Sequence, residues 1–343
     1  MHVLVGYMRN NRHPQKLAKL TALICSHYDI ELIYIRPRDV DMNNNTVTGK
    51  ILVGEEWKVV KRDLPSLIDI SQYLFKQKNK EVINYLRNNS ILTFDRNIPL
   101  SKAKLQSELS KDKNFDYLVI PTQKLKTLDD LIDYLDKYDA VVLKPIIGQK
   151  GKGVYILNKI SDNQYKIGYR TNELIWSYDE LLNFFNNEIM HKNYIAQKYI
   201  SSRTRQGDPF DCRLHVQKNR NGQWQLLHSY IRIGIGQKVM SNVNLGGGVS
   251  DTSSFLKANF SVNWQEIYKQ LITISETLPY KIEELKQVNL MTLGFDIAID
   301  RDSKIYLFES NGSPTIKNIV GESAMFRVNY YLYLLDKNKD PSL

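Results

Sequence analysis

The chain has 343 residues and a formal charge of +10, and its length predicts two or three subdomains. Its composition, 42% hydrophobic and 24% charged, excludes a disordered, collagen-like or low-complexity protein. No apolar run approaches the roughly 20 residues of a membrane span, and the first residues lack the apolar core of a secretory signal. The two cysteines give no disulfide framework, so we expect a cytoplasmic protein with no membrane span.

The positive charge is compatible with three kinds of partner: nucleic acid, an anionic nucleotide or an acidic peptide. The sequence contains no zinc-finger spacing, no RNA-recognition aromatic signature and no long basic tract. We therefore expect no nucleic-acid partner and favour a nucleotide or an acidic peptide. The composition does not define an oligomeric state.

Residues 1–100 are expected to form a small α/β unit. Hydrophobic periodicity predicts, in chain order, a strand at 2–5, a helix at 14–27, a strand at 31–35, a hairpin after 43–45, a helix at 79–88 and a strand at 91–94. This unit contains neither GxGxxG nor GxxxxGK[ST], so two common nucleotide-binding signatures are absent from it.

A second and a third unit are expected at 101–200 and 201–343. The second is predicted to contain helices at 101–112 and 178–189, a helix opening near 127, and strands at 117–121, 140–145 and 194–200. The third is predicted to contain long strands within 211–233, a helix at 264–278, strands at 293–299 and 304–309, and a terminal helix at 322–336.

A glycine-rich loop follows the strand that ends at Lys144. The segment combines glycines and lysines in the order Lys144, Gly148, Lys150, Gly151, Lys152 and Gly153. Glycines let backbone N–H groups turn inward around an anion, and the lysines supply counter-charge. The pattern therefore favours a phosphate cradle, and the alternative is a flexible hairpin with solvated lysines.

Two carboxylates and an amide are expected to converge in the last third of the chain. Alternation places Glu309 and Asn311 on one face of their strand, and the turn at 300–302 brings Asp296 beside them. The same alternation predicts that Phe295 and Phe308 are buried on the opposite face. Oxygen ligands of this kind suit Mg²⁺. The alternative is an acidic strand end that faces solvent.

A third cluster lies on a strand where period-two alternation aligns four polar side chains on one face, Asp211, Arg213, His215 and Gln217. Arg213 is placed to hold a phosphoryl oxygen through two hydrogen bonds, and Cys212 points away from it. An internal Asp–Arg pair is the alternative interpretation. A second glycine-rich loop, at 241–248, is either part of the site or a connector.

These motifs, in this chain order, resemble the ATP-grasp superfamily, and in particular its YheC/YheD-type endospore-coat-associated group. The resemblance covers about residues 95–343 and is carried by L-K-P with its G-x-x-G-x-G-V loop, D-x-R, S-N-x-x-x-G-G, and G-x-D with E-x-N-x-S-P. The motifs are also similar to those of ribosomal-protein glutamate ligases. Residues 1–100 resemble the small α/β domain that precedes many ATP-grasp folds, and 101–200 and 201–343 then correspond to the central (lid) and C-terminal subdomains.

The resemblance implies a role for each matching residue. Residues implied to bind ATP are Lys104 (or its neighbour Lys102), Lys144, the loop residues Gly148, Lys150, Gly151, Lys152 and Gly153, the adenine-side residues Gln197, Lys198 and Ile200, and Asn242 on the acyl-phosphate side. Arg213 and Lys144 are the implied catalytic residues, and the implied Mg²⁺ ligands are Asp296, Glu309 and Asn311. Two positions depart from the glutamate-ligase pattern: Leu245 replaces an arginine, and Thr315 follows Pro314 where glycine is common.

The sequence therefore predicts a three-part α/β ATP-grasp fold with ATP bound between the middle and C-terminal parts. The expected activity is ATP-dependent carboxylate–amine ligation through an acyl phosphate, for example the addition of glutamate to a peptide or protein. An amino acid, a peptide or both would be the substrates. The competing interpretations are an ATP-binding structural component of a spore coat and a kinase-like transfer to a hydroxyl group.

Overall fold

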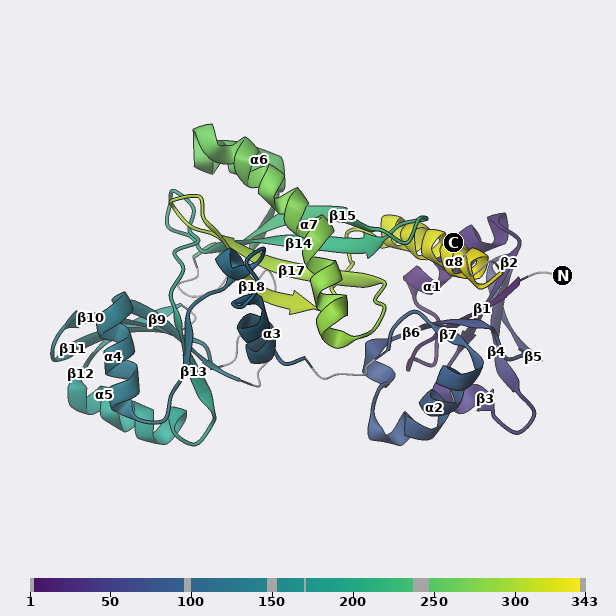
Figure 1. The fold of residues 1–343 in the computed structure, drawn as a ribbon, viewed down its shortest axis with the longest axis horizontal. Helices are drawn as coiled ribbons and strands as arrows, with labels where there is room; N and C mark the ends of the chain where they lie inside the picture. Colours follow the sequence, from purple (N-terminus) through teal and green to yellow (C-terminus); the bar gives the residue numbers. More distant parts are fainter. Residues whose placement is uncertain (1–2, 96–99, 147–152, 170, 237–246, 340–343) are drawn as a thin grey trace.

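The computed structural model describes residues 3–95, 100–146, 153–169, 171–236 and 247–339. Within these ranges the chain forms three sheets that follow one another along the long axis of the molecule (Figure 1). The mixed α/β architecture confirms the predicted fold class.

The first sheet has seven strands in the order β3-β4-β2-β1-β6-β7, with β5 paired to β4. Its parallel centre is covered on both faces, so the strands are apolar almost throughout. One face packs against α1, and Ile83 and Leu86 of α2 cover the other. The elements are β1 (Val3–Met8), α1 (Lys16–His27), β2 (Ile30–Ile35), β3 (Val40–Asp41), β4 (Thr46–Val53), β5 (Glu56–Asp63), β6 (Leu67–Ile70), α2 (Lys80–Asn89) and β7 (Ile91–Leu92).

The second sheet has six strands in the order β12-β11-β10-β9-β13-β8 and forms a separate lobe (Figure 1). Its helices begin at capping boxes, Thr127 with Asp130 and Ser177 with Glu180. The elements are β8 (Thr122–Lys124), α4 (Leu128–Tyr138), β9 (Ala140–Pro145), β10 (Tyr155–Ser161), β11 (Gln164–Tyr169), β12 (Asn172–Ser177), α5 (Tyr178–Phe184) and β13 (Tyr194–Lys198). The strand predicted at 117–121 was wrong, because Asp116–Leu118 forms a 3₁₀ turn that precedes β8.

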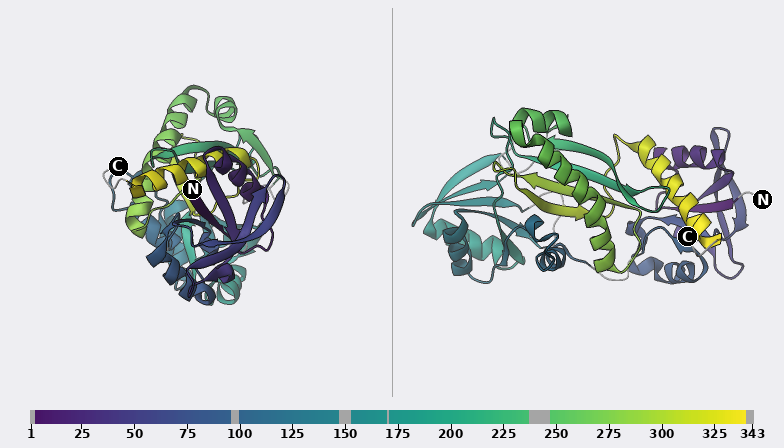
Figure 2. Two further views of the ribbon diagram at one scale, coloured as in Figure 1. Left: turned by 90° about the vertical axis from the view of Figure 1, so that its right-hand side faces the viewer. Right: turned by 45° about the horizontal axis from the view of Figure 1, so that its top comes forward.

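The third sheet has five antiparallel strands in the order β16-β15-β14-β17-β18, and α7 lies across one of its faces (Figure 2). Alternation along β14 buries Cys212, Leu214 and Val216 in the apolar core beneath α7. The elements are α3 (Lys102–Leu109), β14 (Phe210–Lys218), β15 (Trp224–Ile233), β16 (Gly248–Asp251), α6 (Thr252–Phe260), α7 (Trp264–Lys286), β17 (Thr292–Ile299), β18 (Ile305–Asn311) and α8 (Val320–Lys339).

Three helices depart from the expectations of local sequence. Helix α7 continues through Pro279, where an end was predicted, because Leu278 and Ile282 are both buried in the core that the helix covers. Helix α3 packs its Leu105 and Leu109 into the core of the third sheet. Helix α8 returns to the first sheet and lies beside α1 (Figures 1 and 2). The sheets lie within residues 3–92, 122–198 and 210–311, and helices α3 and α8 pack on sheets that are distant from them in sequence.

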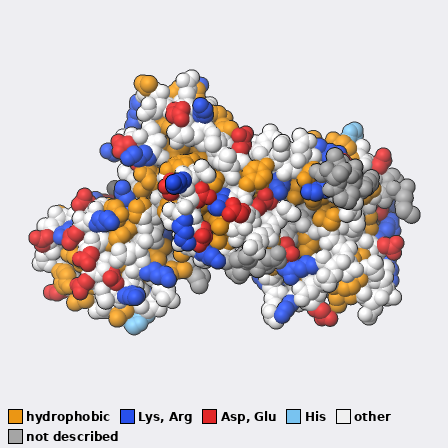
Figure 3. Space-filling model, in the orientation of Figure 1, with side chains coloured by type: hydrophobic (Ala, Val, Ile, Leu, Met, Phe, Trp, Pro, Cys, Tyr) orange, Lys and Arg blue, Asp and Glu red, His pale blue; other side chains and the backbone are white. Residues whose placement is uncertain are grey.

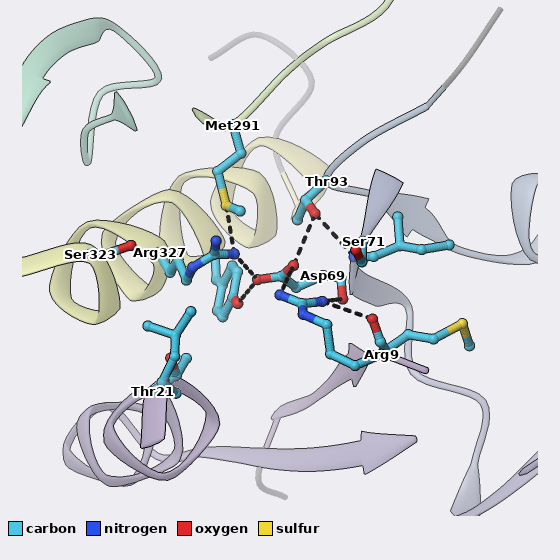
Figure 4. Close-up of polar contacts among 12 residues, drawn as sticks. Arg9, Thr21, Asp69, Ser71, Thr93, Met291, Ser323 and Arg327 are labelled. Atoms are coloured by element: carbon cyan, nitrogen blue, oxygen red, sulfur yellow. Dashed lines mark hydrogen bonds and ion pairs between the residues drawn. The ribbon is translucent and has the colours of Figure 1, made fainter. Parts of the chain in front are cut away.

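A buried carboxylate joins α8 to the first sheet. Asp69, at 1% exposure, accepts hydrogen bonds from Arg9 at 2.9 Å, from Arg327 at 2.6 Å and from the Tyr331 hydroxyl (Figure 4). Burial alone would raise the pKa of Asp69, but the charges of Arg327 and Arg9 outweigh burial and hold this pKa at about 2. Asp69 is therefore the counter-ion of two arginines from opposite ends of the sequence.

No described helix combines the length and the apolarity that crossing a bilayer requires.

Substitution Asp69→Asn is expected to lower the free energy of unfolding by about 3–5 kcal/mol, because it leaves the buried guanidinium of Arg327 and the partly buried one of Arg9 without a counter-ion. Urea denaturation measures the change. Asp336→Asn is the matched control, since Asp336 and its partner Arg220 are both 46% exposed and such a pair contributes at most about 1 kcal/mol. Equal losses in the two variants would show that the buried cluster does not stabilise the fold.

Candidate functional site

A cavity of about 460 Å³ lies between the second and third sheets, with α3 along one side. Apolar side chains form much of its wall, and a few polar groups converge on it, which is the usual composition of a ligand site. The wall includes Ile120, Lys144, Gln197, Leu293, Leu307, Phe308 and Glu309. The cavity wall thus includes Lys144, from the predicted phosphate cradle, and Glu309, from the predicted Mg²⁺ ligands.

Lys144 and Gln197 meet inside this cavity. They lie on neighbouring antiparallel strands, β9 and β13, and the Lys144 Nζ donates to Gln197 Oε1 at 2.6 Å. The Gln197 Nε2 in turn donates to Thr122 Oγ1 on β8 at 3.0 Å. Gln197 is 5% exposed, so this chain of hydrogen bonds fixes both side chains on the cavity wall.

The acidic cluster is shaped by a β-bulge. Asp296 on β17 pairs with Glu309 on β18, whereas Ile297 pairs with Leu307, so Phe308 is the extra residue. The bulge turns Glu309 to the face of Asp296, where Asn311 donates to Asp296 Oδ2 at 3.5 Å. Phe308 therefore lies half-buried on the cavity side, and the prediction that it is buried opposite the acids was wrong.

Two arginines engage Asp296. The Arg213 Nε contacts Asp296 Oδ1 from the paired strand β14, and the Arg232 Nη2 lies 3.0 Å from the same oxygen. Arg232 also contacts Asp211 at 2.6 Å. Burial disfavours the charge of Arg232, but the carboxylates of Asp211 and Asp296 raise its pKa well above the ordinary value. Arg213 is thus a member of an internal ion network as well as a candidate ligand for phosphate.

The donor set suits a magnesium ion in its chemistry. Asp296, Glu309 and Asn311 offer carboxylate and amide oxygens from adjacent strands, and directly opposite residues have Cβ atoms about 5 Å apart. Among the described residues, no group of three His, Cys, Asp or Glu side chains is arranged to hold a metal. The predicted set has only two such side chains, and its third oxygen would come from an amide.

The remaining predicted residues are distributed unevenly around the cavity. Lys104 is exposed on α3 and is absent from the described cavity wall, to which its neighbour Ala103 contributes. Ile200 is buried beside Ile120, and the Lys198 backbone N–H donates to the Pro121 carbonyl at 3.0 Å. These two residues support the β8–β13 side of the cavity, although the described part of its wall does not include them.

The glycine-rich loops fall largely outside the described residues. Gly153 is described and has a φ of +70°, and an added Cβ would lie 2.5 Å from the Tyr194 hydroxyl oxygen, so this position requires glycine. The predicted residues that lie outside the described ranges are Gly148, Lys150, Gly151, Lys152 and Asn242, and the side chain of Lys102 is outside them as well.

Sequence reasoning missed three residues that shape the site. Arg232 could have been found from the hairpin that pairs it with Asp211. Gln106 of α3 donates to the Leu307 carbonyl at 3.0 Å, and its Oε1 accepts from the Ile120 N–H at 3.3 Å, which joins α3 to the cavity wall. Nothing in the local sequence around Gln106 or Thr122 indicates these long-range contacts.

The fold and this site define a protein of the ATP-grasp class. Residues 90–334 match the family described as YheC/D like ATP-grasp, and the chain belongs to that family. The chain is 22% identical over 329 residues to the endospore coat-associated protein YheC of Bacillus subtilis (strain 168), which covers 93% of this chain and 90% of the relative. The family and fold point to an ATP-dependent ligase.

Two solved structures share the fold. One is the ATP-grasp ligase PsnB complexed with precursor peptide PsnA2 and AMPPNP, with a TM-score of 0.53, 10% identity, and coverage of 96% of this chain and 98% of that one. The other is the C-terminal domain of K. lactis Pby1, an ATP-grasp enzyme that interacts with the mRNA decapping enzyme Dcp2. It aligns with a TM-score of 0.52 and 13% identity over 96% of this chain and 91% of that one.

His215 lies next to this site, and its burial predicts how the free energy of unfolding depends on pH. Burial, Arg327 and Arg213 lower the pKa of His215 to about 3, so the folded chain keeps it neutral. In the unfolded chain the His215 imidazole binds a proton below about pH 6.5. The stability that the folded chain gains from keeping His215 neutral is therefore complete above that pH and is lost as the pH falls towards 3. His215→Gln should therefore remove up to about 1.4 kcal/mol per pH unit from the slope of unfolding free energy between about pH 6 and 4.

Denaturant titrations at several pH values measure this slope. His13→Gln, at an exposed position, is the matched control. Parallel pH curves for the wild type and His215→Gln would contradict the assignment of a buried neutral imidazole.

Proposed function

We propose that the chain is an ATP-dependent carboxylate–amine ligase that forms an amide bond through an acyl phosphate. The observation that carries the proposal is the meeting of Lys144, Gln197 and Glu309 on the wall of one cavity between two sheets. Family membership supports a nucleotide as the ligand of that cavity. The apolar residues Ile120, Leu293 and Phe308 give a purine base a dry surface.

The proposed roles combine the described positions of the side chains with the family resemblance. Lys144 holds nucleotide phosphates, and the resemblance assigns residues 148–153 to the same phosphates. Arg213 orients the transferring phosphoryl group and balances the charge that develops on it. Lys198 and Ile200 shape the adenine side through the backbone, and Asn242 belongs to the acyl-phosphate side. The exposed Lys104 is the weakest member of the predicted set.

Mg²⁺ held by Asp296, Glu309 and Asn311 would neutralise phosphate charge during the transfer. In the first reaction, a carboxylate oxygen of the substrate attacks the γ-phosphorus of ATP, and the bond to the departing ADP breaks. In the second, an amine nitrogen attacks the acyl carbon, phosphate leaves and the nitrogen loses a proton. Arg213 and the position of the two substrates supply the catalysis, so no covalent enzyme intermediate is required.

The substrates proposed are an amino acid, a peptide or both, because the PsnB structure contains a precursor peptide and the motifs resemble those of glutamate ligases. We also propose a cytoplasmic chain that can associate with spores, since the YheC relative is named an endospore coat-associated protein. That name supports a second candidate function, an ATP-binding component of a spore coat without ligase activity.

Hydroxylamine separates these functions, because it attacks an acyl phosphate at carbon and leaves a stable hydroxamate. The chain is incubated with ATP, Mg²⁺, hydroxylamine and pooled amino acids and peptides, and mass spectrometry detects the products. A ligase gives ADP together with a hydroxamate. A phosphorylated hydroxyl product would indicate a kinase, and the absence of turnover would favour the structural role.

Substitution Glu309→Gln is expected to reduce hydroxamate formation about a hundredfold or more, because one anionic oxygen next to the transferring phosphate is lost. Glu276→Gln, an exposed position on α7, is the matched control and should retain full activity. Melting temperatures of both variants test whether the fold is intact. Normal turnover by Glu309→Gln at limiting Mg²⁺ would remove Glu309 from the site.

A further inference from the structure

A second cavity, of about 160 Å³, lies between the first sheet and the segment that follows β18. The first sheet and its following loop contribute Arg9, Asp69 and Gln72, and the C-terminal part contributes Gly312, Pro314 and Arg327. Of these six residues, only Gly312 also lines the cavity at Lys144. Figure 4 shows the polar side chains around Asp69.

The charged side chains that line this cavity have a net positive charge. Two guanidinium groups, Arg9 and Arg327, share the single carboxylate of Asp69. The low pKa of Asp69 keeps that carboxylate ionised, so the three groups together have one excess positive charge. This charge is buried, since Arg327 is 8% exposed, and a buried charge favours an anionic partner.

Arg327 is held in the cavity wall by its contact with Asp69. Its Nη1 donates to Asp69 and lies 4.0 Å from Met291 Sδ. Its buried Nε has no hydrogen-bond partner among the described residues. A planar guanidinium such as that of Arg327, which lines the cavity, suits the two oxygens of a carboxylate better than a lysine does.

Arg9 is held in a fixed position on the same wall. Its Nη1 donates to the carbonyls of Met8 at 2.8 Å and Asp69 at 2.7 Å. Its guanidinium carbon lies 3.7 Å from the centre of the Tyr7 ring. The positive wall of the cavity is therefore organised before any ligand binds, which lowers the cost of binding.

The two cavities meet at Gly312, which lines both. Here Gln72 approaches closely, and a Cβ added to Gly312 would lie 2.6 Å from Gln72 Oε1, so a larger residue would displace the wall. Gly312 directly follows Asn311 and the β18 residues that face Asp296. A ligand in the second cavity thus lies next to the end of β18, where the phosphoryl group is expected.

We propose that the second cavity binds the carboxylate group of the substrate, with the guanidinium groups of Arg327 and Arg9 in its wall as the positive contacts. The proposal rests on the proposed function, because it supplies the acid that the ligase would activate. The substrate would then be a compound with a free carboxylate at one end, and that end would be small enough to enter the cavity. Asp69 positions the two arginines and does not contact the reacting atoms.

Carboxylate binding is tested without nucleotide by saturation-transfer NMR, with acetate, succinate, L-glutamate and N-acetyl-L-glutamate as probes at millimolar concentration and inorganic phosphate as a competing anion. At least one carboxylate should bind the wild type. Arg327→Lys retains the charge beside Asp69 but loses the planar guanidinium, and should weaken binding about tenfold or more. Ile316→Trp fills the cavity without changing the ion cluster, and should weaken binding as well.

Arg220→Lys, in the exposed pair with Asp336, is the matched control and should bind like the wild type. The proposal is overturned if no probe binds the wild type, if Arg327→Lys and Ile316→Trp both bind with unchanged affinity, or if phosphate binds more tightly than every carboxylate. Binding of Mg·ADP is measured on the same samples. Because the probes are titrated without nucleotide, a failure here is distinguishable from a failure of the proposed ligase activity.

Discussion

The carboxylate of Asp296 is the contact on which the site depends. It lies where β14, β17 and β18 run side by side, and it joins Arg213, Arg232 and Asn311. Strand register brings these groups together, so their convergence follows from the sheet and not from a flexible loop. Removing the Asp296 carboxylate would take away the described ion-pair partner of Arg213, whereas Arg232 would keep Asp211. A site held by such a network keeps its geometry before a ligand binds.

The first sheet forms part of the proposed active region. Helix α8 leaves the third sheet, packs beside α1 and brings Arg327 to Asp69. This contact closes the second cavity, and Gly312 then connects it to the first. The excess positive charge of the chain is not gathered in one stripe on the face seen in Figure 3, where acidic and basic side chains are interspersed. The positive charge in the proposed carboxylate site is instead that of Arg327, which is buried, and Arg9, which is partly buried.

Local sequence predicts the face of a side chain correctly where a regular strand alone determines that face. Period two along β14 correctly separates Arg213 from Cys212, because both faces of that strand are buried by different partners. It was not sufficient at Phe308, since an extra residue in β18 changes the face of every later side chain, and a bulge has no signature in that segment. Pro279 shows the same limit, because tertiary packing outweighs the local preference for a helix end. The Arg327–Asp69 contact spans 258 residues and depends on the path of α8.

Calorimetric titration with Mg·ADP tests the central claim most directly, namely that the cavity at Lys144 and Gln197 is a nucleotide site. The wild type should bind one nucleotide per chain. Lys144→Ala should weaken the affinity about tenfold or more, because a charge-assisted contact with phosphate is lost while the fold remains intact. No heat of binding in the wild type, or equal affinity in wild type and variant, would contradict the account.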